Sequence, residues 1–130
     1  MTLMPKTGLK PNTADFENHP LVKPTGFREY DARWVLNDEI NLLGIQALGL
    51  GLATYVHEVG QRPRIVVGHD YRSYSLAVKQ ALTLGLLEGG MEVVDIGLAL
   101  SPMAYFAQFE LDCPCVAMVT HGQSSSNWAK

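Results

Sequence analysis

The feature that most constrains the fold is an alternation of short apolar runs with longer amphipathic stretches. The runs are rich in β-branched residues and read as strands at 64–68, 92–96 and 116–120. Amphipathic stretches at about 73–89 and 102–109 separate them and read as helices. Strands that alternate with helices of this length predict a parallel sheet with right-handed crossovers.

A further strand and helix precede this series. Residues 27–34 alternate apolar and polar side chains, which predicts a half-buried strand. Asn37 or Asp38 can cap a helix that runs to about Gly60. Its apolar residues recur at spacings of three and four: Ile45, Leu48, Leu52, Val56 and Val59. The predicted fold class is α/β, a three-layer α/β/α sandwich around a mainly parallel four-stranded sheet.

The N-terminal part of the chain lacks this periodicity. Residues 1–26 hold prolines at positions 5, 11, 20 and 24, so we expect an extended N-terminal arm without evident chemistry. Residues 27–130 are then the organised domain. The length of 130 residues is typical of one globular domain.

Charge and hydropathy exclude two classes of partner. Ten basic and thirteen acidic residues give a net charge of -3, which offers no attraction to nucleic acid or to an anionic membrane. The apolar stretches fall short of the roughly 20 residues that cross a bilayer, and the N-terminus has no secretory pattern. We expect a soluble, cytoplasmic protein.

Three places could carry chemistry, because open α/β sheets bind ligands beyond the carboxyl ends of their strands. They are Tyr30–Arg33, the turn 68–73 and the tail after Thr120. In the turn, Asp70 can simply cap the next helix. Arg72 is better placed if it pairs with Asp70 or with an anionic ligand, because it otherwise opposes the helix dipole. The serine-rich tail could equally be an unstructured end.

Five ordered blocks of sequence are similar to a known family. Residues 27–33 resemble its F-R-x-Y-D-I-R-G opening, and residues 68–75 resemble its G-R-D-x-R-x-S block. The G-x-x-V-x-D-x-G, T-P and G-x-M-x-T-A-S-H-N blocks have counterparts at 89–97, 101–103 and 116–120. The family is that of the α-D-phosphohexomutases, the phosphomannomutases and phosphoglucomutases.

The resemblance implies an isomerase of carbohydrate metabolism. Such enzymes interconvert hexose 6-phosphate and hexose 1-phosphate, of mannose or glucose, through a phosphoserine, a bisphosphorylated sugar and Mg²⁺. By resemblance, Tyr30 and Arg33 would bind the hexose phosphate substrate, with Arg33 also counted as catalytic. Asp70, Arg72 and His121 would support the phosphate loop.

The tail departs from the family pattern, in which Thr120 would be followed by Ala-Ser-His-Asn. Counting residues onward from Thr120 aligns Gly122 with the catalytic serine of the family pattern and Trp128 with a tryptophan further along that pattern. A local shift would instead make Ser124 the nucleophile, and Lys130 resembles the lysine that follows the loop. Two more departures lie upstream, where Trp34 stands in place of glycine and His69 in place of arginine.

The resemblance also implies that much of the enzyme is missing from this sequence. The chain reads as domain I cut short inside its phosphoserine loop, and the acidic D-G-D-G-D-R metal loop is absent. We therefore expect an inactive fragment that binds no Mg²⁺ by itself. The alternative is a non-catalytic module that binds anions or self-associates through an exposed domain interface. A receiver-like regulatory domain is a third reading, but the strand ends lack its acidic cluster.

Overall fold

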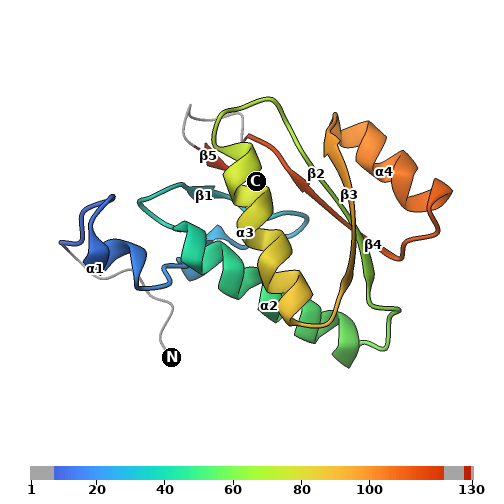
Figure 1. The fold of residues 1–130 in the computed structure, drawn as a ribbon, viewed down its shortest axis with the longest axis horizontal. Helices are drawn as coiled ribbons and strands as arrows, with labels where there is room; N and C mark the ends of the chain where they lie inside the picture. Colours follow the sequence, from blue (N-terminus) through green and yellow to red (C-terminus); the bar gives the residue numbers. More distant parts are fainter. Residues whose placement is uncertain (1–7, 122–127, 130) are drawn as a thin grey trace.

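A parallel sheet forms the centre of the molecule, which we describe from a computed structural model over residues 8–121 and 128–129 (Figure 1). Its strand order is β3-β2-β4. The strands are β2 (Arg64–His69), β3 (Glu92–Leu98) and β4 (Cys115–Val119). Both β3 and β4 run parallel to β2, with Val66 paired to Val94 on one side and to Val116 on the other.

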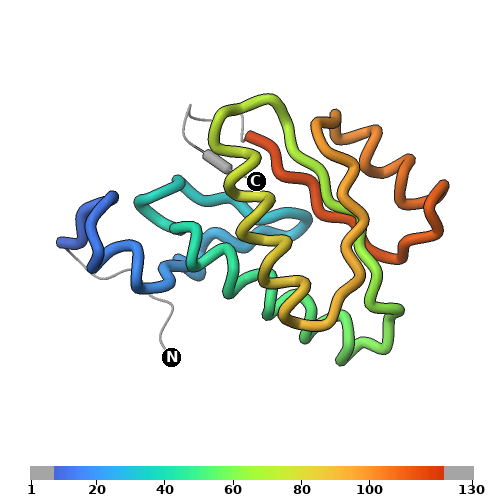
Figure 2. The backbone as a smooth tube through the Cα atoms, viewed as in Figure 1, coloured from blue at the N-terminus to red at the C-terminus, as the bar shows by residue number. Residues whose placement is uncertain are grey.

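Helices cover both faces of this sheet. Helices α2 (Leu42–Glu58) and α3 (Ser75–Glu88) lie side by side on one face, and α4 (Ser101–Glu110) lies on the other (Figures 1 and 2). The predicted α/β fold with a parallel sheet between helices is confirmed. No helix in the described part of the chain is both long enough and apolar enough to span a membrane.

The number of strands was predicted wrongly, because residues 27–34 do not join the parallel sheet. This segment folds back on itself: Phe27 bridges Ala32, and the Arg28 N–H donates to the Asp31 carbonyl oxygen over 2.8 Å. Between residues 27 and 35 only Trp34–Val35 form a strand, β1, which pairs antiparallel with β5 (Trp128–Ala129). The alternation of apolar and polar residues therefore belongs to a tight turn, and the described parallel sheet has three strands.

Helix α2 begins later than predicted. Asn37 has a left-handed backbone (φ 70°) and its N–H donates to the Ile40 carbonyl oxygen, so residues 37–40 form a turn. Asn41 is the N-cap instead, with its side-chain oxygen 2.7 Å from the Gly44 nitrogen. At the other end Val59, the last residue of the apolar spacing, is the C-cap and is 48% exposed.

The N-terminal segment is more structured than an extended arm. Within residues 8–26 it forms α1 (Ala14–Glu17) and a 3₁₀ turn, η1 (Pro24–Gly26). Three of its apolar side chains are buried: Phe16, Leu21 and Val22. These side chains remove apolar surface from water, which is why the segment packs against the domain.

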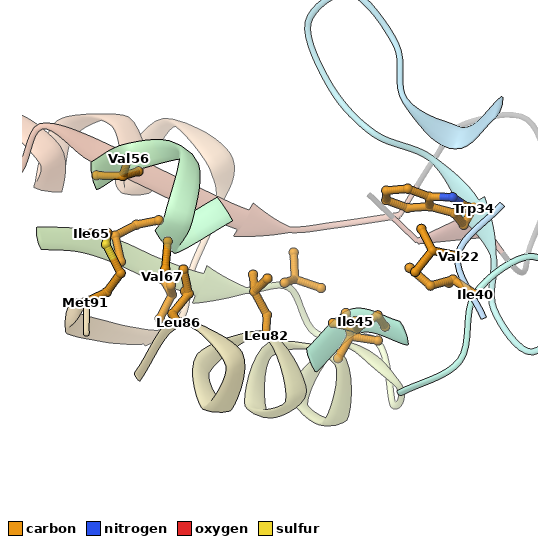
Figure 3. Packing of buried hydrophobic residues seen from close by; sticks show 13 residues of the cluster. Val22, Trp34, Ile40, Ile45, Val56, Ile65, Val67, Leu82, Leu86 and Met91 are labelled. Atoms are coloured by element: carbon orange, nitrogen blue, oxygen red, sulfur yellow. The ribbon is translucent and has the colours of Figure 1, made fainter. Parts of the chain in front are cut away.

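One continuous apolar core joins the helices to the sheet. Ile65 and Val67 of β2 face α2 and α3, where Leu82 and Leu86 pack against them (Figure 3). A second part of the same cluster gathers Trp34, Val22 and Ile40 beyond the N-terminal end of α2 (Figure 3). The N-terminal segment thus shares a core with the α/β unit.

Candidate functional site

The carboxyl ends of the three parallel strands are tied to one another. The Asp70 N–H, directly after β2, donates to the Val119 carbonyl oxygen at the end of β4 over 3.0 Å. On the other side, the Ala99 N–H donates to the His69 carbonyl oxygen over 2.9 Å. The turn after β2 is therefore held by both neighbouring strands at the edge where α/β folds bind ligands.

Asp70 organises this turn through both carboxylate oxygens. Its Oδ1 accepts the Ser75 hydroxyl over 2.5 Å and the Arg72 N–H over 3.2 Å. Its Oδ2 accepts the Arg72 guanidinium over 2.7 Å. Burial disfavours the charged carboxylate, but the bonds from Ser75 and Arg72 outweigh it and hold the pKa of Asp70 below its ordinary value.

This arrangement shows the first of the two predicted pairings of Arg72, that with Asp70. The guanidinium pairs with Asp70 and lies over the Tyr71 ring, 4.7 Å from its centroid. The predicted capping of α3 by Asp70 is wrong, because Tyr74 is the N-cap and makes no side-chain cap bond. Ser75 is instead the first helical residue and binds Asp70. Arg72 braces the turn through an ion pair.

An ion pair between α3 and β3, with a buried lysine and an exposed aspartate, was missed by sequence reasoning. Lys79 of α3 is only 3% exposed, and its Nζ lies 2.8 and 2.7 Å from the two carboxylate oxygens of Asp95 on β3. Burial raises the pKa of Asp95, but the bonds from Lys79 and the Gly97 N–H overcome it and lower that pKa. The signal was a lysine at helical spacing between the buried Ser75 and Leu82.

His69 lies at the end of β2. Its Nδ1 is buried and has no hydrogen-bond partner among the described residues. In the sheet His69 pairs with Leu98 of β3 on one side and with Val119 of β4 on the other.

Tyr30 and Arg33 lie on the turn that replaces the expected first strand. Tyr30 is at the tip and is 92% exposed. The Arg33 guanidinium binds Asp31, with its Nε and Nη2 at 3.1 and 3.0 Å from Oδ2. Arg33 is therefore held in an ion pair within its own turn.

Comparisons with known proteins identify the family. The family described as "Phosphoglucomutase/phosphomannomutase, alpha/beta/alpha domain I" matches residues 24–128. The chain belongs to this family. As a phosphohexomutase domain I, it is related to isomerases of carbohydrate metabolism.

Curated phosphohexomutases resemble most of the chain. A phosphomannomutase of Escherichia coli is 34% identical over 104 residues, which are 80% of this chain and 22% of the relative. Proteins named "Phosphohexose mutases" from Xanthomonas campestris and "Probable phosphoglucosamine mutase" from Pyrococcus furiosus are each 38% identical, over 94 and 100 residues. Those matches cover 72% and 75% of this chain but 20% and 21% of the relatives. The chain spans about a fifth of the length of these relatives.

A solved structure supports the fold. A phosphoglucomutase/phosphomannomutase family protein from Burkholderia thailandensis superposes with a TM-score of 0.74 and 24% sequence identity. The match covers 84% of this chain and 25% of that protein. At this identity the likeness concerns the fold alone.

The structure describes one contact at each end of residues 121–128. On one side the His121 ring lies 6.5 Å from the Tyr74 ring, centroid to centroid. On the other side, Trp128 pairs with Val35 next to the turn of Arg33. The predicted catalytic residues Ser124 and Lys130 lie outside the described residues, so their roles stay predictions.

The described residues do not fit a Mg²⁺ site. Among them, no group of three or more His, Cys, Asp or Glu side chains could hold a metal ion. The acidic residues at the strand ends are already engaged, Asp70 by Arg72 and Asp95 by Lys79. Mg²⁺ prefers several fixed oxygen ligands, and this set does not provide them.

Proposed function

We propose that the chain is the domain I part of an enzyme that interconverts hexose 6-phosphate and hexose 1-phosphate through a phosphoserine and a bisphosphorylated sugar. The observation that carries this proposal is the hydrogen-bonded strand edge. The Asp70 N–H joins the turn after β2 to the end of β4, just before residues 122–127, where the proposal locates the phosphoserine. Family membership supports the type of reaction, and the strand edge supports the place in the domain where the reaction would occur.

Phosphoryl transfer depends mainly on positioning and on neutralising charge. In this proposal Asp70, Arg72 and His121 hold the strand ends from which the phosphoserine loop departs. Tyr30 bounds the sugar pocket, and Arg33 binds phosphate with its planar guanidinium. Because Arg33 is paired with Asp31, a phosphate would compete with that carboxylate for the guanidinium.

In this proposal Mg²⁺ would be bound by residues other than those that the structure describes. When bound in such enzymes, the ion would neutralise the phosphoryl group. Since the described residues provide no ligand cluster for it, we assign no step of this chain to a metal. The proposal covers phosphates of mannose, glucose and glucosamine, the three sugars in the names of the relatives.

The identity of the nucleophile decides whether the chain can be phosphorylated, and its tail can be aligned with the family pattern in two ways. In the unshifted alignment Gly122 occupies the position of the family serine, so this chain has no nucleophile and should be inactive alone. With a shifted loop, Ser124 takes that place. The test is intact mass and phosphopeptide mapping after incubation with glucose 1,6-bisphosphate, with the Escherichia coli phosphomannomutase treated in parallel as a control.

Two variants make that test specific. A phosphate on Ser124 that disappears in Ser124→Ala would establish the shifted register and a phosphorylatable site. If the chain stays unmodified but Gly122→Ser becomes phosphorylated, the unshifted register is correct and the natural chain has lost its nucleophile. No phosphate on any of these proteins, under conditions that charge the control enzyme, would contradict the phosphotransfer proposal for this chain.

A second candidate function is self-association through α4. Segment 96–109 contains no charged residue, so two copies can meet across a two-fold axis without like-charge repulsion. Phe109 is 81% exposed, and the same segment exposes five more apolar side chains: Leu98, Leu100, Met103, Tyr105 and Phe106. A shallow groove of about 430 Å³ adjoins them, lined by Ile96, Ala99, Pro102, Met103, Phe106 and Ala107. We propose a second copy of the chain as the occupant.

Sedimentation velocity over a range of concentrations tests this candidate. The natural chain should form a dimer, and Phe109→Glu should shift it to the monomer because aromatic anchors dominate such interfaces. Tyr55→Glu, on the exposed side of α2, is the matched control and should still dimerise. A natural chain that remains monomeric at high concentration would contradict the candidate.

A further inference from the structure

The segment that precedes the family match is integrated into the domain. The match to the domain I family begins at residue 24, yet Phe16, Leu21 and Val22 before it are at most 5% exposed. We call residues 16–23 the strap. Val22 belongs to the same core as residues of β2 and α2, and Phe16 and Leu21 are buried as well, so the strap is a structural part of the domain.

The strap lies antiparallel to the residues just before α2. Val22 bridges Ile40, and the Lys23 N–H donates to the Glu39 carbonyl oxygen over 2.8 Å. The Lys23 ammonium also pairs with the Glu39 carboxylate at 2.7 Å. Asn41 closes the far end, since its Oδ1 accepts the Leu21 N–H over 3.0 Å.

Trp34 connects the strap to the turn that carries Tyr30 and Arg33. Its indole N–H donates to the Lys23 carbonyl oxygen over 2.8 Å, and the residue is only 4% exposed. The ring lies directly against Gly26, where a Cβ would overlap the indole. Its neighbour Phe27 contacts it edge-on, with ring centroids 5.1 Å apart. In the family pattern this position is usually glycine, which could make none of these contacts.

The contacts of Trp34 fall at both ends of the turn. Phe27 begins the turn and Trp34 follows its last residue, Arg33, whose N–H donates to the Gly26 carbonyl oxygen over 2.8 Å. One indole therefore holds both ends of a turn whose tip, Tyr30, is exposed. Figure 3 shows Trp34 grouped with Val22 and Ile40 at this corner of the molecule.

We propose that Trp34 and the strap form a positioning device for the turn 27–33, and so for the hexose phosphate contacts of Tyr30 and Arg33. The assignment of a hexose phosphate rests on the proposed function, whereas the ordering of the turn does not. Trp34 is a positioning residue here, because it acts through the turn and touches no substrate.

Hydrogen exchange of the full chain, followed by mass spectrometry, tests the ordering. Trp34→Phe keeps a ring but removes the N–H donor, so peptides of residues 27–33 should exchange about fivefold faster, as expected for the loss of one buried hydrogen bond. Peptides of β2 and β3 should be unchanged. Equal protection of 27–33 in both proteins would overturn the proposal, as would faster exchange throughout the chain.

A second variant approaches the same contact from the other side. Gly26→Ala places a methyl group against the indole and should loosen the same peptides, with Gly51→Ala as the control because a Cβ there meets nothing. If Gly26→Ala fails to fold, the milder Trp34→Phe result decides. If peptides of residues 27–33 also exchange faster in the Gly51→Ala control, the ordering of the turn by Trp34 is contradicted.

Ligand binding separates this inference from the proposed function. If the natural chain binds glucose 1,6-bisphosphate, Trp34→Phe should raise the Kd by about fivefold, in proportion to the loosened turn. An unchanged Kd with a loosened turn would overturn the positioning role. If neither protein binds, the proposed function is weakened, and the exchange experiment still decides whether Trp34 orders the turn.

Discussion

Asn41 shows how one polar side chain can join distant parts of this chain. It is fully buried, and its Oδ1 accepts N–H groups from Leu21 and Gly44. Its Nδ2 donates to the carbonyl oxygens of Phe16 and His19 over 3.0 and 2.7 Å. The residue is at once the cap of α2 and the anchor of the strap.

Asn41→Ala should lower the free energy of unfolding by about 2–4 kcal/mol, because it removes a helix cap and leaves several buried backbone groups without partners. Urea denaturation followed by circular dichroism measures the change. Asn18→Ala, at an exposed position with φ -94°, is the control and should change stability by less than about 0.5 kcal/mol. A similar small loss for Asn41→Ala would show that water replaces its bonds.

Asp70 is the corresponding residue at the strand edge. Asp70→Asn should destabilise the chain by about 1–3 kcal/mol, because the charge-assisted bond to Arg72 is lost while the Ser75 hydroxyl must find an acceptor. Asp38→Asn, at an exposed position, is the matched control and should change stability little. Thermal unfolding compares the two. If Asp70→Asn behaves like the control, the turn is held by backbone bonds alone.

At the scale of elements, the α2–α3 contact depends on glycine. Gly49 of α2 lies against the backbone of Leu82 and Leu86, and Gly85 of α3 lies against the backbone of Gln46. A Cβ at either glycine would overlap a backbone carbonyl oxygen of the other helix. Close packing of the two helices therefore requires both positions to lack a side chain.

Gly85→Ala should therefore destabilise the domain by about 1–3 kcal/mol through overpacking. Gly51→Ala makes the same chemical change in α2 at an open position, and it should stabilise by up to about 1 kcal/mol through helix propensity. The midpoints of urea unfolding measure both. Opposite signs are the expected result, and two stabilised variants would mean that the helices separate at little cost.

At the scale of the whole molecule, stability should fall in acid. The pKa of Glu39 is lowered by Lys23 and the Val35 N–H, and those of Asp70 and Asp95 are lowered because hydrogen bonds outweigh burial. A carboxyl with a lowered folded pKa stabilises the native state above its unfolded pKa, here 3.8 for Asp and 4.5 for Glu. That stabilisation is lost as pH falls through the folded values.

Thermal unfolding between pH 7 and pH 2.5 tests this expectation. The melting temperature should be nearly constant down to about pH 5 and should then decrease. Asp70→Asn should show a shallower decrease, because one of the responsible carboxyls is gone. A natural chain that is equally stable at pH 7 and pH 3 would show that these ion pairs and hydrogen bonds do not favour the folded state.

The sequence by itself determined the α/β class, the helix and strand pattern after residue 64 and the family resemblance. These features are local, because periodicity reports which side of an element is buried: Val78, Leu82 and Leu86 of α3 recur every four residues and are all buried. The pairing of Arg72 with Asp70 was one of two interpretations, because the two residues are neighbours in one turn.

Only the tertiary structure decided what happens before that region. The alternation in 27–34 suits a strand or a folded-back turn, and the choice follows from contacts with Gly26 and Trp34. The burial of Lys79 depends on Asp95 of another strand. The anchoring of the strap by Asn41 joins residues more than twenty positions apart. Such partners are brought together by packing of the whole chain, and no local pattern of residues records them.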